Sequence, residues 1–429
     1  MTDIIEKKRD KGALSKKEIE FFVSGVTDRS IPDYQISALL MAIVLNGMER
    51  RETLLLTDAM AKSGDMLDLS ALPHTADKHS TGGVGDKTTL IAAPAAAALG
   101  CTVAKMSGRG LGFTGGTVDK LEAITGYRTA VSAEEFKETA KRQGICIVGQ
   151  SGDFAPADKR LYALRDVTAT VNSIPLIASS IMSKKLAAGA ETIVLDVKYG
   201  SGAFMKTPKE AESLAREMVE IGRGAGRKTA ALITDMNSPL GLAVGNALEV
   251  REAANVLKGK GPEDLRRISA LLAARMYQLS FGVSEEESLS AAERVISDGS
   301  ALEKLCGAVE AMGGDSKLIT GEHEFPAAGA RLEVFAKSEG YITSVNCENI
   351  GKAASLTGAG RERLEDRLDY SAGIMLDKKY GDYTEKGERL AVLYGAGERL
   401  PDAARELLSA FEIGAEKPPE SKLVYKIIC

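Results

Sequence analysis

Apolar positions recur at helical spacing through the first 65 residues. Ser15 stands before an apolar run and Glu18 follows three residues later, a spacing that predicts a capping box at a helix start. Residues 36–45 (ISALLMAIVL) are apolar on every side, so this helix needs cover from several directions. A second subunit and later helices of the same chain are two sources of that cover, and the pattern leaves both open.

From residue 75 onward, short apolar runs alternate with helical stretches. This alternation predicts a mainly parallel sheet flanked by helices, with ligands at the carboxyl ends of the strands. Residues 157–188 form a helical excursion that Pro175 divides, and we expect it to pack on the N-terminal helices. The five apolar runs are residues 76–78, 102–106, 145–149, 191–197 and 228–235.

The pattern changes again near Pro326. Residues 262–313 are helical with charged faces, whereas the residues after Pro326 are strand-like and rich in turns. We therefore expect an α/β plus all-α protein with a small N-terminal helical domain, a large α/β domain with a mainly parallel sheet, and a C-terminal α+β domain. The expected boundaries are 1–66 with 157–190 for the helical domain, 70–156 with 191–325 for the α/β domain, and 331–429 for the C-terminal domain.

The composition excludes several classes of function. A net charge of -5 argues against a general binder of nucleic acid or membrane surfaces, so any affinity for phosphate must come from a local site. No apolar run approaches the roughly 18 residues of a membrane span, and the charged N-terminus lacks a signal-peptide core. Five scattered cysteines without CxxC spacing indicate a reducing compartment, and the three histidines are too dispersed for a metal triad. We expect a cytoplasmic protein.

Residues 78–90 (KHSTGGVGDKTTL) form the first of two glycine-rich loops. Its glycines let the backbone approach a ligand closely, and the helix-forming run that follows directs unsatisfied N–H groups toward that ligand. Asp86 stands between Gly85 and Lys87, which breaks the nucleotide P-loop pattern and repels a polyphosphate. The loop is thus typical of a site for a single phosphate, and a tight strand-to-helix turn is the structural alternative.

The second loop, residues 107–117 (SGRGLGFTGGT), is also rich in glycine and also follows a strand-like run, at 102–106. Its glycines match the dinucleotide fingerprint only formally. Ser107 and Thr117 add hydroxyl donors, and we expect Thr117 to cap the next helix. Two helix starts that converge on one small anion fit a single phosphate better than a dinucleotide.

Together with two further segments, these loops closely resemble the pyrimidine nucleoside phosphorylase and thymidine phosphorylase family. The further segments are ADKRLYALRDVTATVNSIPLIASSIMSKK and DVKYGSGAFM, and the resemblance extends over essentially the whole chain. It implies reversible phosphorolysis of uridine, thymidine and deoxyuridine to free base and (deoxy)ribose 1-phosphate. It also implies a homodimer that uses inorganic phosphate as co-substrate and no other cofactor, apart from the potassium ion that some relatives bind.

The resemblance assigns roles to residues by motif position. For phosphate it implies Lys78, Ser80, Thr89, Ser107 and Thr117. For the pyrimidine it implies Arg165, Ser180 and Lys184, with Tyr162 against the ring, and for catalysis His79, Arg165 and Lys184. Spacing at i, i+3 and i, i+4 places Tyr162 with Arg165, and Ser180 with Lys184, on common helix faces. Without the resemblance, Arg165 and Lys184 would more often be solvated helix charges, and simple helix capping is the less favoured alternative for the phosphate-binding hydroxyls.

Two further residues bear on mechanism and substrate range. His79 adjoins Lys78, and its unperturbed pKa near 6.5 suits either a general acid or a charge stabiliser at the leaving pyrimidine. Lys105 stands where broad-specificity relatives have lysine and relatives strict for deoxyribose have an apolar residue. A lysine can contact the ribose 2'-hydroxyl, so we expect uridine to be cleaved as well as thymidine.

The chain departs from the family pattern at two positions. Phe113 stands where relatives usually have histidine. Lys87 replaces the threonine of relatives that bind potassium near Gly85, Leu240, Ala243 and Glu252. Either potassium or the Lys87 ammonium group can fill that position, and the sequence leaves the choice open.

Three rival functions differ in testable ways. A thymidine phosphorylase restricted to deoxyribonucleosides is disfavoured by Lys105. An anthranilate-type phosphoribosyltransferase of similar architecture needs a diphosphate and magnesium site, for which no paired carboxylates follow the glycine loops. A non-catalytic phosphate- or nucleoside-binding protein would bind these ligands without turnover.

Overall fold

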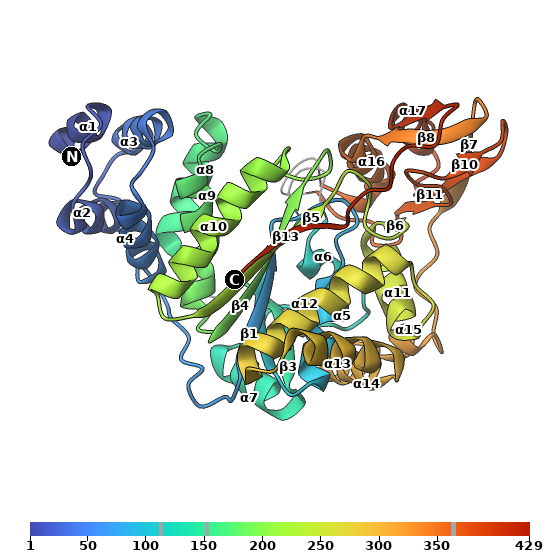
Figure 1. Cartoon of the computed structure of the whole chain (residues 1–429), viewed down its shortest axis with the longest axis horizontal. Coiled ribbons are helices and arrows are strands. Elements are labelled where there is room, and N and C mark those ends of the chain that lie inside the picture. Colours follow the sequence, from blue (N-terminus) through green and yellow to red (C-terminus); the bar gives the residue numbers. More distant parts are fainter. Residues whose placement is uncertain (111–114, 151–153, 362–365) are drawn as a thin grey trace.

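Six helices from two separate parts of the chain form one bundle, at the left of Figure 1. The computed structural model describes residues 1–110, 115–150, 154–361 and 366–429. The capping box is confirmed, because Ser15 Oγ accepts the N–H of Glu18 while the Glu18 carboxylate accepts the N–H of Ser15. The bundle comprises α1 (Thr2–Arg9), α2 (Lys16–Thr27), α3 (Asp33–Asn46), α4 (Arg50–Ala61), α8 (Pro156–Val167) and α9 (Ile174–Ala187).

The apolar helix α3 is covered by the chain's own helices on one side. Ile36, Leu39 and Leu40 are fully buried in a cluster that also contains Leu161 of α8. On its other side Tyr34 and Leu45 remain about three-quarters exposed, at 74% and 75%. The chain's own helices therefore cover one face of α3, and the other face is exposed.

A six-stranded sheet forms the centre of the molecule, with the order β13-β5-β4-β1-β2-β3. All five apolar runs are confirmed as strands, and these five pair in parallel. Their bounds are β1 (Thr75–Ser80), β2 (Thr102–Ser107), β3 (Ile145–Gly149), β4 (Thr192–Tyr199) and β5 (Lys228–Asp235). The sixth strand, β13 (Val424–Ile428), pairs antiparallel with β5.

Helices cover both faces of this sheet, which is why its five parallel strands are buried along almost their whole length. Ile193 and Leu195 of β4 pack in a cluster with α10 on one face, whereas Val194 joins the cluster that contains α5 and α12 on the other. The helices of this part are α5 (Thr89–Ala98), α6 (Thr117–Glu122), α7 (Ala133–Gln143), α10 (Pro208–Gly224), α11 (Asn246–Leu257), α12 (Glu263–Phe281), α13 (Glu285–Ser297), α14 (Ser300–Ala311) and α15 (Lys317–Thr320). No helix within the described ranges is long and apolar enough to cross a membrane.

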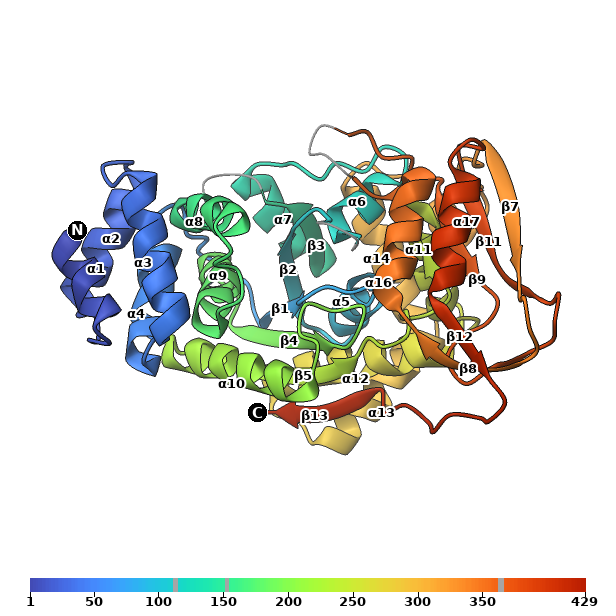
Figure 2. The same cartoon turned by 90° about the horizontal axis from the view of Figure 1, so that it is seen from above.

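The C-terminal part contains two small antiparallel sheets and two α-helices, at the right of Figure 2. One sheet has the order β10-β8-β12, and the other has the order β6-β9-β11-β7. The elements are β6 (Ala243–Val244), β7 (Ala330–Phe335), β8 (Gly340–Val345), α16 (Cys347–Ala354), a π-helical turn (Ser355–Ala359), β9 (Gly373–Leu376), β10 (Tyr383–Thr384), β11 (Arg389–Gly395), α17 (Leu400–Ser409) and β12 (Phe411–Gly414).

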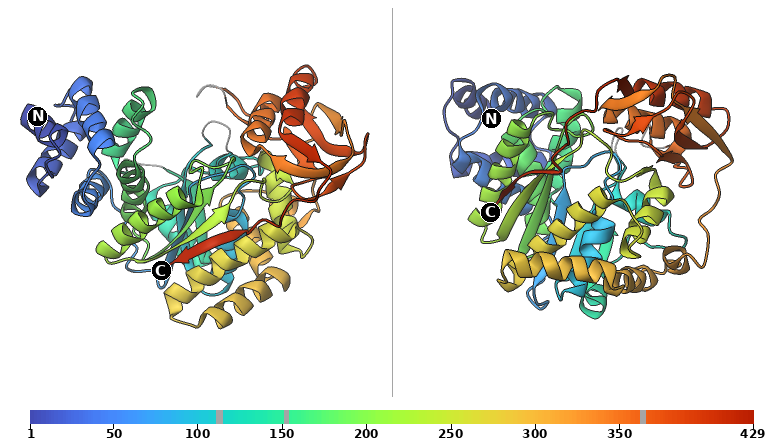
Figure 3. Two further views of the ribbon diagram at one scale, coloured as in Figure 1. Left: turned by 45° about the horizontal axis from the view of Figure 1, so that its top comes forward. Right: turned by 45° about the vertical axis from the view of Figure 1, so that its right-hand side comes forward.

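The α/β part and the C-terminal part exchange strands. Strand β6, which precedes α11, pairs with β9 of the C-terminal part. In return, β13 leaves the C-terminal part and extends the central sheet, as the two views of Figure 3 show. The expected boundary at 331–429 placed residues 424–428 in the C-terminal domain, and their pairing with β5 places them in the α/β sheet instead. The apolar side chains of so short a strand do not reveal which sheet it joins.

Candidate active site

The first glycine loop connects β1 to α5 at the carboxyl end of the sheet. Gly82 and Gly85 have φ values of +88° and +74°, a left-handed conformation that glycine adopts without strain. Next to this loop lies a cavity of about 350 Å³, which both glycine loops and the helices α8 and α9 line. Ser80, Thr89, Ser107 and Thr117, four of the five expected phosphate ligands, line this cavity, together with His79, Lys105, Tyr162 and Lys184.

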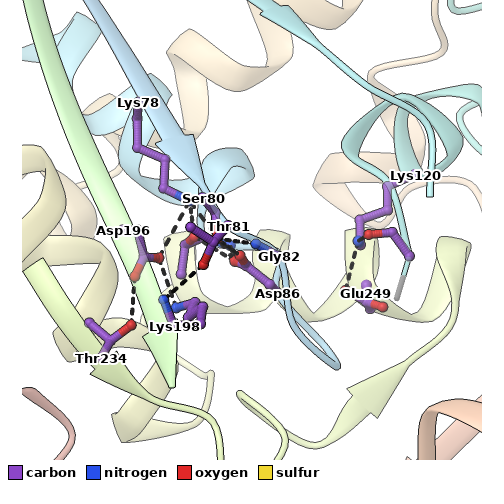
Figure 4. A network of polar contacts seen from close by, with 12 residues as sticks. Lys78, Ser80, Thr81, Gly82, Asp86, Lys120, Asp196, Lys198, Thr234 and Glu249 are labelled. Carbon is purple, nitrogen blue, oxygen red and sulfur yellow. Dashed lines mark hydrogen bonds and ion pairs between the residues drawn. The ribbon is translucent and has the colours of Figure 1, made fainter. Parts of the chain in front are cut away.

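The fifth expected phosphate ligand, Lys78, points away from this cavity. Its side chain is fully buried, and its ammonium group donates to Thr88 Oγ1 at 2.5 Å and lies 3.6 Å from Asp196 (Figure 4). Side chains alternate along a strand, so Lys78 and the next residue, His79, face opposite sides. Lys198, 2.7 Å from Asp196, completes a group of buried charges beneath the loop.

Asp86 forms hydrogen bonds with other residues of the first glycine loop. Its carboxylate accepts hydrogen bonds from Ser80 Oγ and from Thr88 Oγ1, the latter at 2.6 Å. Burial by itself raises the pKa of Asp86, but the charges of Lys78 and Lys198 and these hydrogen bonds outweigh it and hold the pKa well below its usual range. Asp86 is therefore ionised, and Ser80 must turn from it to donate to a ligand.

The second glycine loop is held by charged groups around α6. Asp119 is buried and accepts hydrogen bonds from the N–H of Gly110 at 2.6 Å and from Arg361 at 2.9 Å. Lys120 lies 3.3 Å from Glu249 and donates to the carbonyl of Gly115 (Figure 4). Thr117 is the first residue of α6 and Gly116 occupies the capping position, so the expected cap by Thr117 is wrong. Phe113 lies outside the described residues.

Two lysines share one buried carboxylate on the cavity wall. Lys185 donates to Asp77 at 2.8 Å and to the carbonyl of Met106 at 3.1 Å, while Lys105 lies 3.4 Å from Asp77 and donates to the carbonyl of Lys78. Burial, together with Lys185 and Lys78, lowers the pKa of Lys105 to about 7 although Asp77 opposes the change. Sequence reasoning missed Lys185, although the adjacent pair Lys184-Lys185 was visible in the motif.

These cations set the charge of His79. Burial, followed by the nearby charges of Lys185, Lys105, Lys78 and Lys184, lowers the pKa of His79 well below 6.5. The imidazole is therefore neutral near pH 7. A general acid requires the imidazolium, whereas the N–H of a neutral imidazole can donate a hydrogen bond, so the direction of this pKa shift favours a charge stabiliser in the ligand-free protein.

A second cavity of about 240 Å³ adjoins the first and shares with it Thr81, Gly82, Tyr162 and Ile181. The expected pyrimidine ligands Arg165 and Ser180 line this second cavity, and Lys184 lines the first. Arg165 donates to the carbonyls of Thr170, Val171 and Leu176, so three of its five N–H groups fix the connection between α8 and α9 and two remain. Lys184 is paired with Asp158 at 2.7 Å.

The second cavity also has an apolar wall that sequence reasoning missed. It consists of Val171, Ile177, Phe204 and Leu214. Phe204 is 44% exposed, and its place in the motif DVKYGSGAFM was the signal available in the sequence. A cavity with apolar walls and a few polar groups is the usual form of a site for a small organic ligand, such as an aromatic ring.

Comparisons with known proteins agree with this geometry. Three family models match the chain: "Glycosyl transferase family, helical bundle domain" over residues 2–64, "Glycosyl transferase family, a/b domain" over residues 72–302, and "Pyrimidine nucleoside phosphorylase C-terminal domain" over residues 341–414. The pyrimidine-nucleoside phosphorylase of Bacillus subtilis (strain 168) is 52% identical and covers 100% of this chain and 99% of that protein. The chain belongs to the pyrimidine-nucleoside phosphorylase family.

A second relative and one solved structure are also similar to this chain. The pyrimidine-nucleoside phosphorylase of Geobacillus stearothermophilus is 50% identical, with 99% of both chains covered. The crystal structure of anthranilate phosphoribosyltransferase from Thermus thermophilus has a TM-score of 0.59 at 20% identity and covers 72% of this chain and 99% of that chain. At this identity the likeness concerns the fold alone, and the expected fold class is confirmed.

A side chain occupies the position at which the sequence led us to consider potassium. The Lys87 ammonium group donates to the carbonyls of Leu240 and Ala243, each at 2.8 Å, and to Glu252 at 2.5 Å. These are three of the oxygen ligands expected for the ion. The residues present therefore do not fit a potassium ion at this position. The described part of the chain also contains no group of three or more His, Cys, Asp or Glu that would hold a metal.

Proposed function

We propose that this protein catalyses the reversible phosphorolysis of pyrimidine nucleosides, with uridine, thymidine and deoxyuridine as substrates and inorganic phosphate as co-substrate. One observation carries the proposal. A cavity lined by hydroxyls and cations adjoins an apolar cavity with Arg165 and Ser180, and the two share four lining residues. An anion and a flat base can thus be held side by side, with the sugar between them. The curated relatives that match over the full chain support the proposal.

In the reaction, a phosphate oxygen forms a bond to C1' of the sugar while the bond from C1' to the pyrimidine nitrogen breaks and its electrons leave with the base. Positive charge develops on the sugar and negative charge on the base, so electrostatic placement supplies much of the catalysis. Arg165, Ser180 and Lys184 stabilise the departing base, which then takes a proton from solvent. The products are free base and ribose or deoxyribose 1-phosphate.

On the phosphate side, hydroxyl groups of both loops bind the anion. Ser80, Thr89, Ser107 and Thr117 line the cavity, and Lys105 and Lys185 place positive charge on its wall. Lys78 adds its charge from beneath the loop, through Thr88. On the base side, neutral His79 donates a hydrogen bond to the leaving pyrimidine and stabilises its charge. Tyr162, which lines both cavities, lies against the ring.

Lys105 supports a broad substrate range. Its ammonium group lines the cavity of about 350 Å³, which we call the phosphate cavity. Its contacts with Asp77 and the carbonyl of Lys78 leave one N–H free for the ribose 2'-hydroxyl. In a thymidine phosphorylase restricted to deoxyribonucleosides, this N–H would have no ribose 2'-hydroxyl to contact.

The test is absorbance-monitored release of base from uridine and from thymidine, each with and without inorganic phosphate. We expect release from both, strictly dependent on phosphate. The Lys105→Met variant should lose uridine turnover selectively, and an equal loss on both nucleosides would contradict the role of Lys105. Release from neither nucleoside, with binding retained, would favour a non-catalytic binding protein.

We also propose a homodimer, a closing movement of the helical bundle on the α/β part, and a cytoplasmic location. The exposed side of α3, with Tyr34, Met41 and Leu45, supports a homodimer through the N-terminal helices. The helical bundle carries the pyrimidine ligands and the α/β part carries the phosphate loops, so closure of one on the other brings the substrates together. The five cysteines have free thiols, which supports a cytoplasmic location.

A further inference from the structure

Lys87 is a charged side chain enclosed in the protein interior, with 1% of its surface exposed. Its three ammonium protons have three acceptors: the carbonyls of Leu240 and Ala243 and the carboxylate of Glu252. The other oxygen of Glu252 accepts the N–H of Leu242 at 2.8 Å. The segment 240–243 thus folds around one positive charge, and no hydrogen-bonding position of the ammonium group is left for another ligand.

The surrounding glycines show how tightly this charge is enclosed. A Cβ atom at Gly85 would lie 2.8 Å from the carbonyl oxygen of Leu240, and one at Gly241 would lie 3.1 Å from the Lys87 ammonium nitrogen. Carbonyl and carboxylate oxygens are also the ligands that bind monovalent cations such as potassium. The position therefore has the chemistry of a cation site, and a lysine of the same chain occupies it.

We propose that the Lys87 ammonium group is a built-in monovalent cation, so that this protein needs no potassium for folding or for activity. The activity half of this inference rests on the proposed phosphorolysis, and the folding half does not. The Lys87 ammonium group connects the first glycine loop, which leads into α5, to residues 240–243, which lead into β6. Thr89, the first residue of α5, lines the phosphate cavity. Because β6 pairs with β9, the same charge connects the phosphate loop to the C-terminal part.

Replacement of this lysine by a smaller residue should recreate an ion site. In Lys87→Thr the carbonyls and Glu252 would keep their places and lose their cation, and an ion that binds only the folded state stabilises it by mass action. The melting temperature of Lys87→Thr should therefore rise with added potassium or ammonium chloride, and much less with choline chloride at equal ionic strength. Phosphorolysis by the variant should increase about 10-fold with the same ions. The wild type should respond to none of them.

The surface variant Lys386→Thr is the matched control, because Lys386 is exposed on a C-terminal turn. Its melting temperature should follow the wild type in every salt. A wild-type protein that is itself stabilised or activated by potassium over choline would overturn the proposal, even if Lys87→Thr does not fold. So would a Lys87→Thr variant that responds equally to choline and potassium. Melting curves report on the cation site even when no phosphorolysis is found, which separates this inference from the proposed function.

Discussion

At the scale of single residues, chemistry at the site depends on which lysines face which neighbours. Lys78 and His79 are consecutive, yet one is paired beneath the loop and the other lines the cavity. Lys105 and Lys185 share Asp77 and place an excess of positive charge beside His79. Burial is the main reason that the pKa of His79 is lowered, and this excess of positive charge, which favours bound anions, adds to the effect.

The lowered pKa of His79 predicts a contribution to stability that depends on pH. Below about pH 6.5 the unfolded chain takes up a proton at this residue and the folded chain does not, so folding becomes less favourable as pH falls. The free energy of unfolding of the wild type should therefore decline more steeply than that of His79→Gln between about pH 7 and 5, by at most about 1.4 kcal/mol per pH unit. Urea unfolding at several pH values measures this difference. A His79→Gln slope equal to that of wild type would contradict the lowered pKa.

At the scale of elements, the second glycine loop is held by the C-terminal part. Arg361 donates to Asp119, which also accepts the N–H of Gly110, and the Tyr370 hydroxyl donates to Glu122 at 3.0 Å. Glu122 in turn accepts hydrogen bonds from Arg109 of the loop at 2.6 and 2.7 Å. The C-terminal part therefore sets the position of a loop that lines the phosphate cavity.

Removal of the hydrogen bond from Arg361 to Asp119 should weaken phosphate binding. In Arg361→Gln a hydrogen bond to the buried Asp119 is lost, which at about 1 kcal/mol corresponds to about a five-fold rise in KM for phosphate. We expect kcat and the KM for nucleoside to change less, since Arg361 lines neither cavity. Initial rates at varied phosphate measure the effect, with Arg399→Gln on the surface as control. Equal changes in both KM values would point to a general loss of structure.

At the scale of the whole molecule, exchanged strands join the α/β part to the C-terminal part. Ile428 of β13 is buried in the cluster beneath α10, although the chain reaches it only after passing through the C-terminal part. Neither part can therefore unfold without breaking strand pairs of the other. We expect these two parts to unfold together.

A test of this coupling is Ile428→Ala. Loss of a buried isoleucine side chain costs about 2 kcal/mol or more, and the variant should lower the melting temperature of one shared transition. Lys422→Ala, exposed just before β13, should leave it unchanged. Calorimetry that resolves two transitions in Ile428→Ala, with only one displaced, would show that the two parts unfold independently.

The sequence alone determined the local features of this protein. The capping box at Ser15, the five parallel strands and both glycine loops depend on residues close together in the chain, where propensity and spacing act directly. It also indicated that Tyr162 with Arg165 and Ser180 with Lys184, all of which line the cavities, are neighbours on helix faces. Only the tertiary structure decided which charged side chains contact each other. Lys87 and Glu252 are 165 positions apart, and β13 crosses from one part to another. Such contacts depend on how whole elements pack, so no pattern within one segment reveals them.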